Sequence, residues 1–283
     1  PGHIFSLNLR AGSMHHIDML RPGSKKKEHE MRALKRLPAS ALRMGEPTGR
    51  KVIIAYDPAV IDYTQWFNWK QGSGIYIVTV EKANSALLCC GERDFDREAP
   101  INKGVVKDEQ VGQSNGGYVC RRISYIDPAT RKHYSFLTTE MTLSPGLIAY
   151  IYKCRWKIEK VFDQFKNKLM ERKAWAASDE AKSQQAGFMC IAHNLMLVLK
   201  SRLASEENVV DRTNDKKRAK RTAEFVQAAA DNGMDFNPML VQPSKAPLMT
   251  LQFIRWVRSA LSVMTSWRRA VDSYSPLAER YLP

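Results

Sequence analysis

The sequence predicts an α/β fold, a mixed sheet flanked by helices, and three observations lead to this prediction. Two short continuous apolar runs, at residues 51–57 and 75–80, have the pattern of central strands covered on both faces. An aromatic-rich helix at residues 61–70 separates them. Turn-rich segments between residues 83 and 143 favour β-hairpins, and long amphipathic segments follow from residue 144. With 283 residues, the chain is long enough for one large domain or two small ones.

The composition is that of a globular protein with a strong positive charge. The net charge is +15 and the isoelectric point is near 9.6, so the chain is expected to meet a polyanion, with nucleic acid first among the candidates. A membrane surface or a ribosome would also suit this charge. No apolar run reaches the roughly 18 residues that span a bilayer. The five cysteines form no C-x-x-C pair, which favours reduced thiols in the cytoplasm over a zinc site.

The N-terminal part predicts a hairpin, a helix and a buried strand. Strands at residues 3–9 and 14–20 flank a turn at Gly12, and a helix is expected at residues 28–37. The buried strand at residues 51–57 ends on Asp57, because Pro58 cannot continue the ladder. An acid just past the C-terminal end of a buried strand lies where open α/β sheets usually bind their ligands. The alternative is an ordinary cap or turn aspartate.

Residues 83–143 predict a β-rich extension with strands at residues 118–125 and 133–139 around a DPATRK turn. Four cations in this part are candidate DNA contacts, although each by itself is expected to be a solvated charge: Arg121, Arg122, Arg131 and Lys132.

A helix over residues 144–173 is the most informative part of the chain. Ser144 is the expected N-cap, Pro145 occupies the first helical position, and apolar residues recur at the spacing of one buried face. Four residues fall within roughly 60° of arc beside that face and form a polar stripe: Tyr152, Arg155, Glu159 and Lys166. The simplest alternative is an i, i+4 ion pair of Arg155 with Glu159, worth about 0.2–0.5 kcal/mol.

The remaining third of the chain predicts further helices. A helix from the N-cap Ser178 to about residue 203 is expected to pack its apolar face, including Phe188, Ile191 and Leu195, on the sheet. His193 inside it is expected to be a core histidine. A polar linker at residues 205–222 and helical segments at residues 219–230 and 248–269 complete the prediction.

The spacing Y-x2-R-x3-E-x6-K of the polar stripe resembles the signature of bacterial insertion-sequence transposases of the DDE class. The segment RWKIEKVFDQFKNKL is similar to the third catalytic segment of that family, and YDPAVIDYTQWFNWKQGSGIYIV is similar to its second-Asp region. The resemblance spans most of residues 3–200 and implies an RNase H-like fold. It also implies a catalytic core in two parts, residues 1–82 and 144–204. A β-rich insertion at 83–143 would separate these parts, and a helical region at 205–283 would follow.

The same resemblance implies a set of site residues. Asp57 and Glu159 match catalytic acids that bind two Mg²⁺ ions, for which Mn²⁺ can substitute, while Tyr152, Arg155 and Lys166 match residues that hold the transposon-end DNA. Asp18 and Asp163 are rival acids. The strand that carries the first catalytic Asp is expected to precede Pro1, so the chain is expected to be an N-terminally truncated fragment without catalytic activity.

The function implied is cut-and-paste transposition. Such an enzyme cleaves double-stranded DNA at its terminal inverted repeats and transfers the ends to target DNA, as a homodimer on DNA, without a membrane, in the bacterial cytoplasm at the nucleoid. The alternatives are an RNase H-like nuclease without strand transfer, and a decayed or domesticated remnant that only binds DNA.

Overall fold

The computed structural model describes residues 2–21, 28–113, 117–163, 165–166, 174, 177–206 and 212–236. Its chain divides into two compact units, which are described one at a time. The first comprises Pro1–Ile4, Ile17–Arg155 and Glu224–Gln242, and the second comprises Phe5–His16, Trp156–Ala223 and Pro243–Pro283. The domain boundaries expected from sequence stay predictions.

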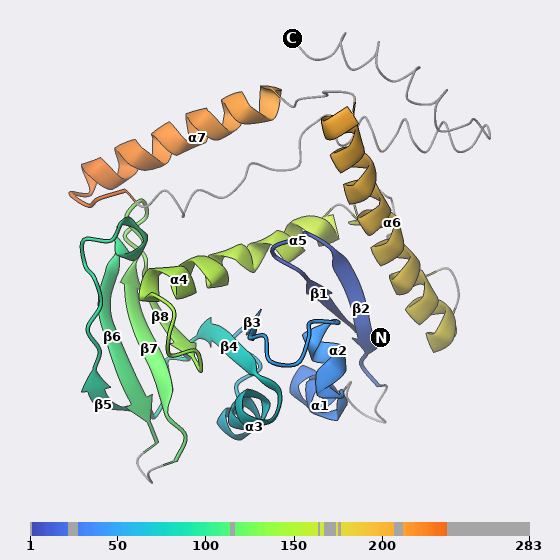
Figure 1. Cartoon of the computed structure of the whole chain (residues 1–283), viewed down its shortest axis with the longest axis horizontal. Coiled ribbons are helices and arrows are strands. Elements are labelled where there is room, and N and C mark those ends of the chain that lie inside the picture. The colour runs from blue at the N-terminus through green and yellow to red at the C-terminus, as the bar shows by residue number, and fades with distance from the viewer. Residues whose placement is uncertain are drawn as a thin grey trace. The chain divides into compact units, whose positions relative to one another are not determined.

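The first unit contains a six-stranded mixed sheet in the order β3-β4-β8-β7-β6-β5 (Figure 1). Its strands are β3 (Val52–Ala55), β4 (Ile75–Val80), β5 (Leu88–Glu92), β6 (Val105–Gly112), β7 (Cys120–Ile126) and β8 (His133–Thr138). Strands β3 and β4 are parallel, whereas every other neighbouring pair is antiparallel. Because β8 pairs with β4, the strands of the predicted insertion continue the sheet of the predicted core.

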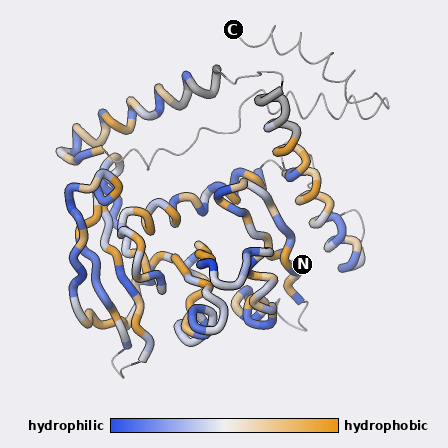
Figure 2. The backbone as a smooth tube through the Cα atoms, in the orientation of Figure 1, coloured by the Kyte–Doolittle hydropathy of each residue, from blue (hydrophilic) through white to orange (hydrophobic). Residues whose placement is uncertain are grey.

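Helices cover both faces of this sheet, so the predicted α/β class with flanking helices is confirmed. Helices α1 (Glu30–Arg36), α2 (Ala39–Arg43) and α3 (Tyr63–Ser73) contribute to a core with Ile75 and Ile77 of β4. Helix α4 (Pro145–Cys154) packs on the other face, in a core with Val78 of β4. The alternation along β4 buries both faces of the strand, as its continuous apolar run predicts; Figure 2 shows apolar segments at β3 and β4.

The two ends of helix α3 are set by local sequence signals. The Asp62 carboxylate accepts a hydrogen bond from the Gln65 backbone N–H at 2.9 Å, which caps the N-terminus. Gly74 ends the helix in the left-handed region, with φ of 60°. Trp66 and Trp69 are buried against the sheet. The helix predicted at residues 61–70 is thus confirmed, with its C-terminal end three residues later.

The second unit is built around the tip of a hairpin. Strands β1 (His3–Leu7) and β2 (Met14–Met19) pair, and they run from one unit into the other. Within the second unit, the hairpin tip shares a core with α5 (Trp156–Asp163) and α6 (Asp179–Glu206). The Asn194 side chain accepts from the Met14 N–H and donates to the Met14 carbonyl. His193 is buried, contacts the Gly12 carbonyl and packs edge-on against Phe165, so the core-histidine prediction is confirmed.

Three sequence predictions about helices need correction. The single helix expected over residues 144–173 is interrupted at Arg155, which forms a turn between α4 and α5. A polar linker was expected at residues 205–222, but helix α7 (Arg212–Asp231) already begins at Arg212. On α6, the apolar side chains of Phe188, Ile191 and Leu195 are exposed instead of packed.

Some observed elements were not predicted from the sequence, and one predicted helix lies outside the described residues. Helix α2 and the separate strands β5 and β6 were not predicted individually. The helical segment expected at residues 248–269 lies outside the described residues. No helix within the described ranges is long and apolar enough to cross a membrane.

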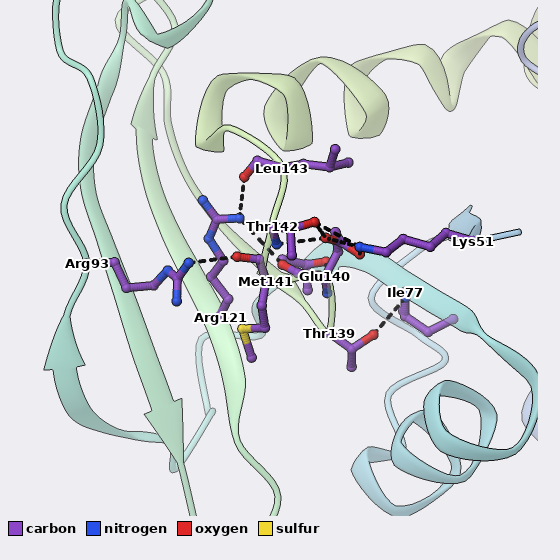
Figure 3. Close-up of polar contacts among 10 residues, drawn as sticks. Lys51, Ile77, Arg93, Arg121, Thr139, Glu140, Met141, Thr142 and Leu143 are labelled. Atoms are coloured by element: carbon purple, nitrogen blue, oxygen red, sulfur yellow. Dashed lines mark hydrogen bonds and ion pairs between the residues drawn. The ribbon is translucent and has the colours of Figure 1, made fainter. Parts of the chain in front are cut away.

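A polar joint at residues 139–143 connects β8 to α4 (Figure 3). The Glu140 side chain is fully buried and accepts hydrogen bonds from Lys51 Nζ at 3.2 Å and from the Thr142 backbone N–H at 2.7 Å. Thr139 Oγ1 accepts from the backbone N–H of Ile77 in β4 at 3.0 Å. The joint is therefore tied both to the residue that precedes β3 and to β4.

Arginines of the β-rich part hold the same joint. Arg93 donates to the Met141 carbonyl at 2.7 Å, and Arg121 donates to the Leu143 carbonyl at 2.6 Å. Arg121 also forms a two-pronged ion pair with Asp108, at 2.8 and 2.5 Å. The side chains of Arg121 and Asp108 are only 2% and 1% exposed, so Arg121 is a structural residue and not the solvated charge that the sequence suggested.

The other three cations considered as DNA contacts are also engaged within the first unit. Arg122 pairs with Glu109 at 3.0 Å and with Glu81 at 3.5 Å. Arg131 donates to the Asn232 carbonyl, and Lys132 lies 5.3 Å from the ring centroid of Tyr134.

We expect Asp108→Ala to lower the free energy of unfolding by about 3–5 kcal/mol, because it leaves the buried Arg121 charge uncompensated. Urea denaturation would measure the change. Glu46→Ala is the matched control, since the described ion pair of the Glu46 side chain is an exposed one with Arg50 at 3.8 Å, whose loss should change little. Equal effects of the two substitutions would contradict this account.

The Glu140 carboxylate predicts a pH dependence of stability. Burial raises its pKa, but hydrogen bonds from Thr142 and the Lys51 charge outweigh that effect and hold the pKa below the ordinary value of a glutamate. Ionised Glu140 therefore stabilises the fold above about pH 4.5, and this contribution is lost as the pH falls through the lower folded-state pKa. The difference in unfolding free energy between the protein and Glu140→Gln should be largest near neutral pH and shrink on acidification. A difference that is constant with pH would refute the assignment.

Candidate functional site

Asp57 follows β3 by two residues and is accessible to solvent. In the described sheet β3 is an edge strand that pairs with β4 alone, so the central position expected for it from its apolar run was wrong. Its side chain is 59% exposed. The parallel pairing of β3 with β4 continues to Tyr56, whose backbone N–H donates to the Val78 carbonyl at 3.2 Å. The structure thus places the carboxylate at the C-terminal end of a parallel strand pair, where the sequence predicted it, and where α/β sheets present ligand-binding groups.

Arg155 meets Asp57 at this edge. Its Nη2 atom lies 3.2 Å from Asp57 Oδ1, and its side chain is 13% exposed. Arg155 is the C-cap of α4, with helical φ and ψ of −51° and −36°, and its backbone N–H donates to the Tyr152 carbonyl at 3.0 Å. The end of α4 and the end of β3 therefore bring together an acid and a cation that are distant in the sequence.

Tyr152, predicted on the polar stripe beside the buried face of the helix, is itself buried. Its ring is buried with Phe136 of β8, at a centroid distance of 5.3 Å. The Arg155 guanidinium carbon lies 5.5 Å from the Tyr152 ring centroid. Burial raises the pKa of the Tyr152 hydroxyl, while the neighbouring Arg155 charge acts in the opposite direction. The Tyr152 ring, held in this core by Phe136, packs next to the Arg155 guanidinium.

Glu159 and Lys166 belong to the second unit, and both are exposed there. Glu159 lies on α5, whose Val161 is buried with the hairpin tip and α6. The rival acid Asp163 is the last residue of α5 and is also exposed. The other rival, Asp18, pairs with Arg36 in the first unit and so has a structural role. Asp57, Tyr152 and Arg155 thus form one observed cluster, whereas Glu159 and Lys166 are placed within a different unit.

The donor chemistry of Asp57 and Glu159 fits a hard divalent cation. Both offer carboxylate oxygens, which Mg²⁺ prefers, and both are accessible to solvent. Within the described residues, no group of three or more His, Cys, Asp or Glu side chains is arranged to hold a metal ion. The structure therefore supports each carboxylate as a ligand of the right type and does not itself assemble a complete metal centre.

The residues that position α4, and with it Arg155, were not identified from the sequence. The joint that precedes α4 is held by four side chains, none of which lies in a recognisable motif: Lys51, Glu140, Arg93 and Arg121. The one usable signal is that Glu140 and its neighbours directly precede the N-terminus of α4.

Comparison with known protein families identifies the family of this chain. The model of the transposase DDE domain family matches residues 7–195, which is about two thirds of the chain and includes Asp57, Tyr152, Arg155 and Glu159. No match was found among curated proteins. The match agrees with the mixed sheet, the flanking helices and the carboxylate at the end of β3. The chain therefore belongs to the DDE transposase family, whose members act on DNA and generally use divalent metal ions.

Proposed function

We propose that this protein is a cut-and-paste DNA transposase that cleaves the ends of its own element and joins them to target DNA. One observation carries the proposal, the contact of Arg155 with Asp57 where α4 and β3 end. It gathers in space two residues of the resemblance that are far apart in sequence. Membership of the transposase DDE domain family supports the same function.

In this proposal, Asp57 and Glu159 are the catalytic acids and hold two Mg²⁺ ions, for which Mn²⁺ can substitute. When bound, such ions activate the attacking oxygen and stabilise the leaving oxygen of a phosphodiester. Each acid contributes anionic oxygens that offset the charge of the cations near a phosphate. These are two of the three acids that the family uses.

Arg155, Tyr152 and Lys166 would hold the DNA. The planar guanidinium of Arg155 can donate two parallel hydrogen bonds to a phosphate, and its position over the Tyr152 ring restricts how it moves. The Tyr152 ring packs in the core, so its contribution is to orient Arg155. Lys166 adds a point charge from the second unit, where its side chain is exposed.

The ion pair of Asp57 with Arg155 has a further role in this proposal. Because Asp57 is more than half exposed, a divalent cation can reach its carboxylate from solvent and compete with Arg155 for it. Arg155 would then be released toward the phosphate that arrives with the cation.

The net charge of +15 supports a double-stranded DNA partner. We assign the terminal inverted repeats and the target DNA as substrates, a homodimer as the DNA-bound form, and the bacterial nucleoid as the place of action. Two outcomes would replace this proposal. Cleavage without joining would indicate an RNase H-like nuclease, and DNA binding without cleavage would indicate a decayed or domesticated remnant.

Glu159→Ala in the intact protein should abolish strand cleavage of a supercoiled plasmid that carries the element, because a metal-binding acid is lost. DNA affinity should stay the same. Cleavage is measured by gel electrophoresis with Mg²⁺ or Mn²⁺ and with a chelator. The matched control is Glu180→Ala, an exposed acid in the first turn of α6. Normal cleavage by Glu159→Ala would overturn the assignment of Glu159.

Arg155→Ala should weaken binding to a labelled DNA duplex and lower the slope of log K against log salt concentration by about 1, because one phosphate contact is lost. Fluorescence anisotropy over a range of salt concentrations measures both quantities. Arg32→Ala, at an exposed position of α1, provides a control that removes the same charge. Identical slopes for the Arg155 and Arg32 variants would show that Arg155 does not contact phosphate.

A further inference from the structure

The N-terminal turn of α4 is held by the β-rich part of the first unit. A short 3₁₀ helix, η1 (Pro100–Asn102), lies between β5 and β6 in the sequence and packs against this turn. Asn102 Oδ1 accepts a hydrogen bond from the Gly146 backbone N–H at 3.0 Å. The Asn102 amide donates to the Asp96 carbonyl at 2.7 Å, so both ends of this buried side chain are bonded.

Gly146 shows how close this approach is. A Cβ atom at this position would lie 1.8 Å from the Ile101 carbonyl oxygen and 2.5 Å from its carbon. Both are backbone atoms, which cannot rotate away as a side chain can. Glycine is therefore required where η1 meets α4, and the two backbones set each other's position.

Arg93 and Arg121 extend this hold to the joint before α4. They donate to the carbonyls of Met141 and Leu143 (Figure 3). The Asp108 carboxylate lies between the two arginines, 3.6 Å from Arg93 Nε and 2.8 Å from Arg121 Nε. The start of α4 is thus fixed by three side chains of the β-rich part: Arg93, Asn102 and Arg121.

The other end of that helix carries the candidate site. Helix α4 has 10 residues and is about 15 Å long at 1.5 Å per residue. Because its backbone hydrogen bonds make it a stiff rod, a shift at Gly146 moves Tyr152 and Arg155 relative to Asp57. Asp57 is placed by a different element, because it follows β3 and its pairing with β4.

We propose that the β-rich part of this protein positions the site through α4, and that Arg93, Asn102 and Arg121 are positioning residues for the Arg155–Asp57 contact. None of the three touches Asp57, Tyr152 or Arg155 in the described hydrogen bonds. Their effect on catalysis rests on the proposed transposase function, whereas their effect on the Arg155–Asp57 contact does not.

The first test reads that contact directly in the protein without DNA. The ¹⁵N NMR cross peak of the Arg155 Nη2 group, assigned with Arg155→Lys, reports whether the contact of Nη2 with Asp57 is formed. Asp57→Asn gives the reference position for the broken pair. We expect Asn102→Ala and Arg93→Met to shift the peak toward that reference, and Arg93→Lys to restore it, since lysine keeps a donor for the Met141 carbonyl.

The matched control is Lys107→Met, an exposed cation of β6 whose described ion pair is a 3.9 Å contact with Glu92. It should leave the peak in place. An unchanged peak in both Asn102→Ala and Arg93→Met would overturn the proposal. Arg93 is partly exposed, so its variants remain informative even where Asn102→Ala does not fold.

The second test concerns catalysis in the intact protein. Arg93→Met should slow strand cleavage at saturating DNA about 10- to 100-fold, as expected for a misplacement of about 1 Å, with the Kd for DNA within about twofold of the parent. Arg93→Lys should recover most of the rate. A Kd that rises in step with the loss of cleavage would contradict positioning. Absence of cleavage in the parent would instead refute the proposed function, and the NMR test would still decide the role of Arg93 and Asn102.

Discussion

The buried ion pair of Asp108 with Arg121 is the interaction on which the arrangement of the first unit depends most. It lies inside the protein, where an unpaired charge is very unfavourable, so β6 and β7 are held in one register. Because Arg121 still has a donor left for the Leu143 carbonyl, the pair also fixes the turn that starts α4. Glu140, bonded to Lys51 and Thr142, fixes the same turn from the side of β3. Charged groups in the interior thus determine where the helix begins.

This anchoring gives the candidate site its geometry. Strand β3 delivers Asp57 to the end of the sheet, and α4 delivers Arg155 to the same place, with Tyr152 packed beneath it. Such a pair suits a divalent cation and a phosphate. The exposed Asp57 carboxylate can exchange the Arg155 cation for a metal ion, and the Arg155 guanidinium can exchange the Asp57 carboxylate for a phosphate. The family match and the basic charge of the chain agree with DNA as that ligand.

Much of the fold followed from local patterns. Strand β4 was predictable because burial on both faces leaves a continuous apolar signature. The same signature placed β3 correctly along the sequence but did not reveal that β3 lies at the edge of the described sheet. Asp57 followed from the proline that ends its strand. Patterns did not reveal that Arg121 is buried or that Tyr152 faces the core, because both depend on partners far away in the sequence, Asp108 and Phe136. The interruption at Arg155 was hidden as well, since the apolar spacing continues through it.

The most direct test of the central claim is a joining reaction. A labelled duplex with a free 3′-hydroxyl at the element's end would be incubated with the intact protein, an unlabelled plasmid and Mg²⁺. The proposed function predicts that label becomes covalently attached to the plasmid, that a 3′-deoxy end prevents this, and that Asp57→Asn prevents it too. Hydrolysis of the duplex without any joined product would contradict a transposase and leave a nuclease in its place.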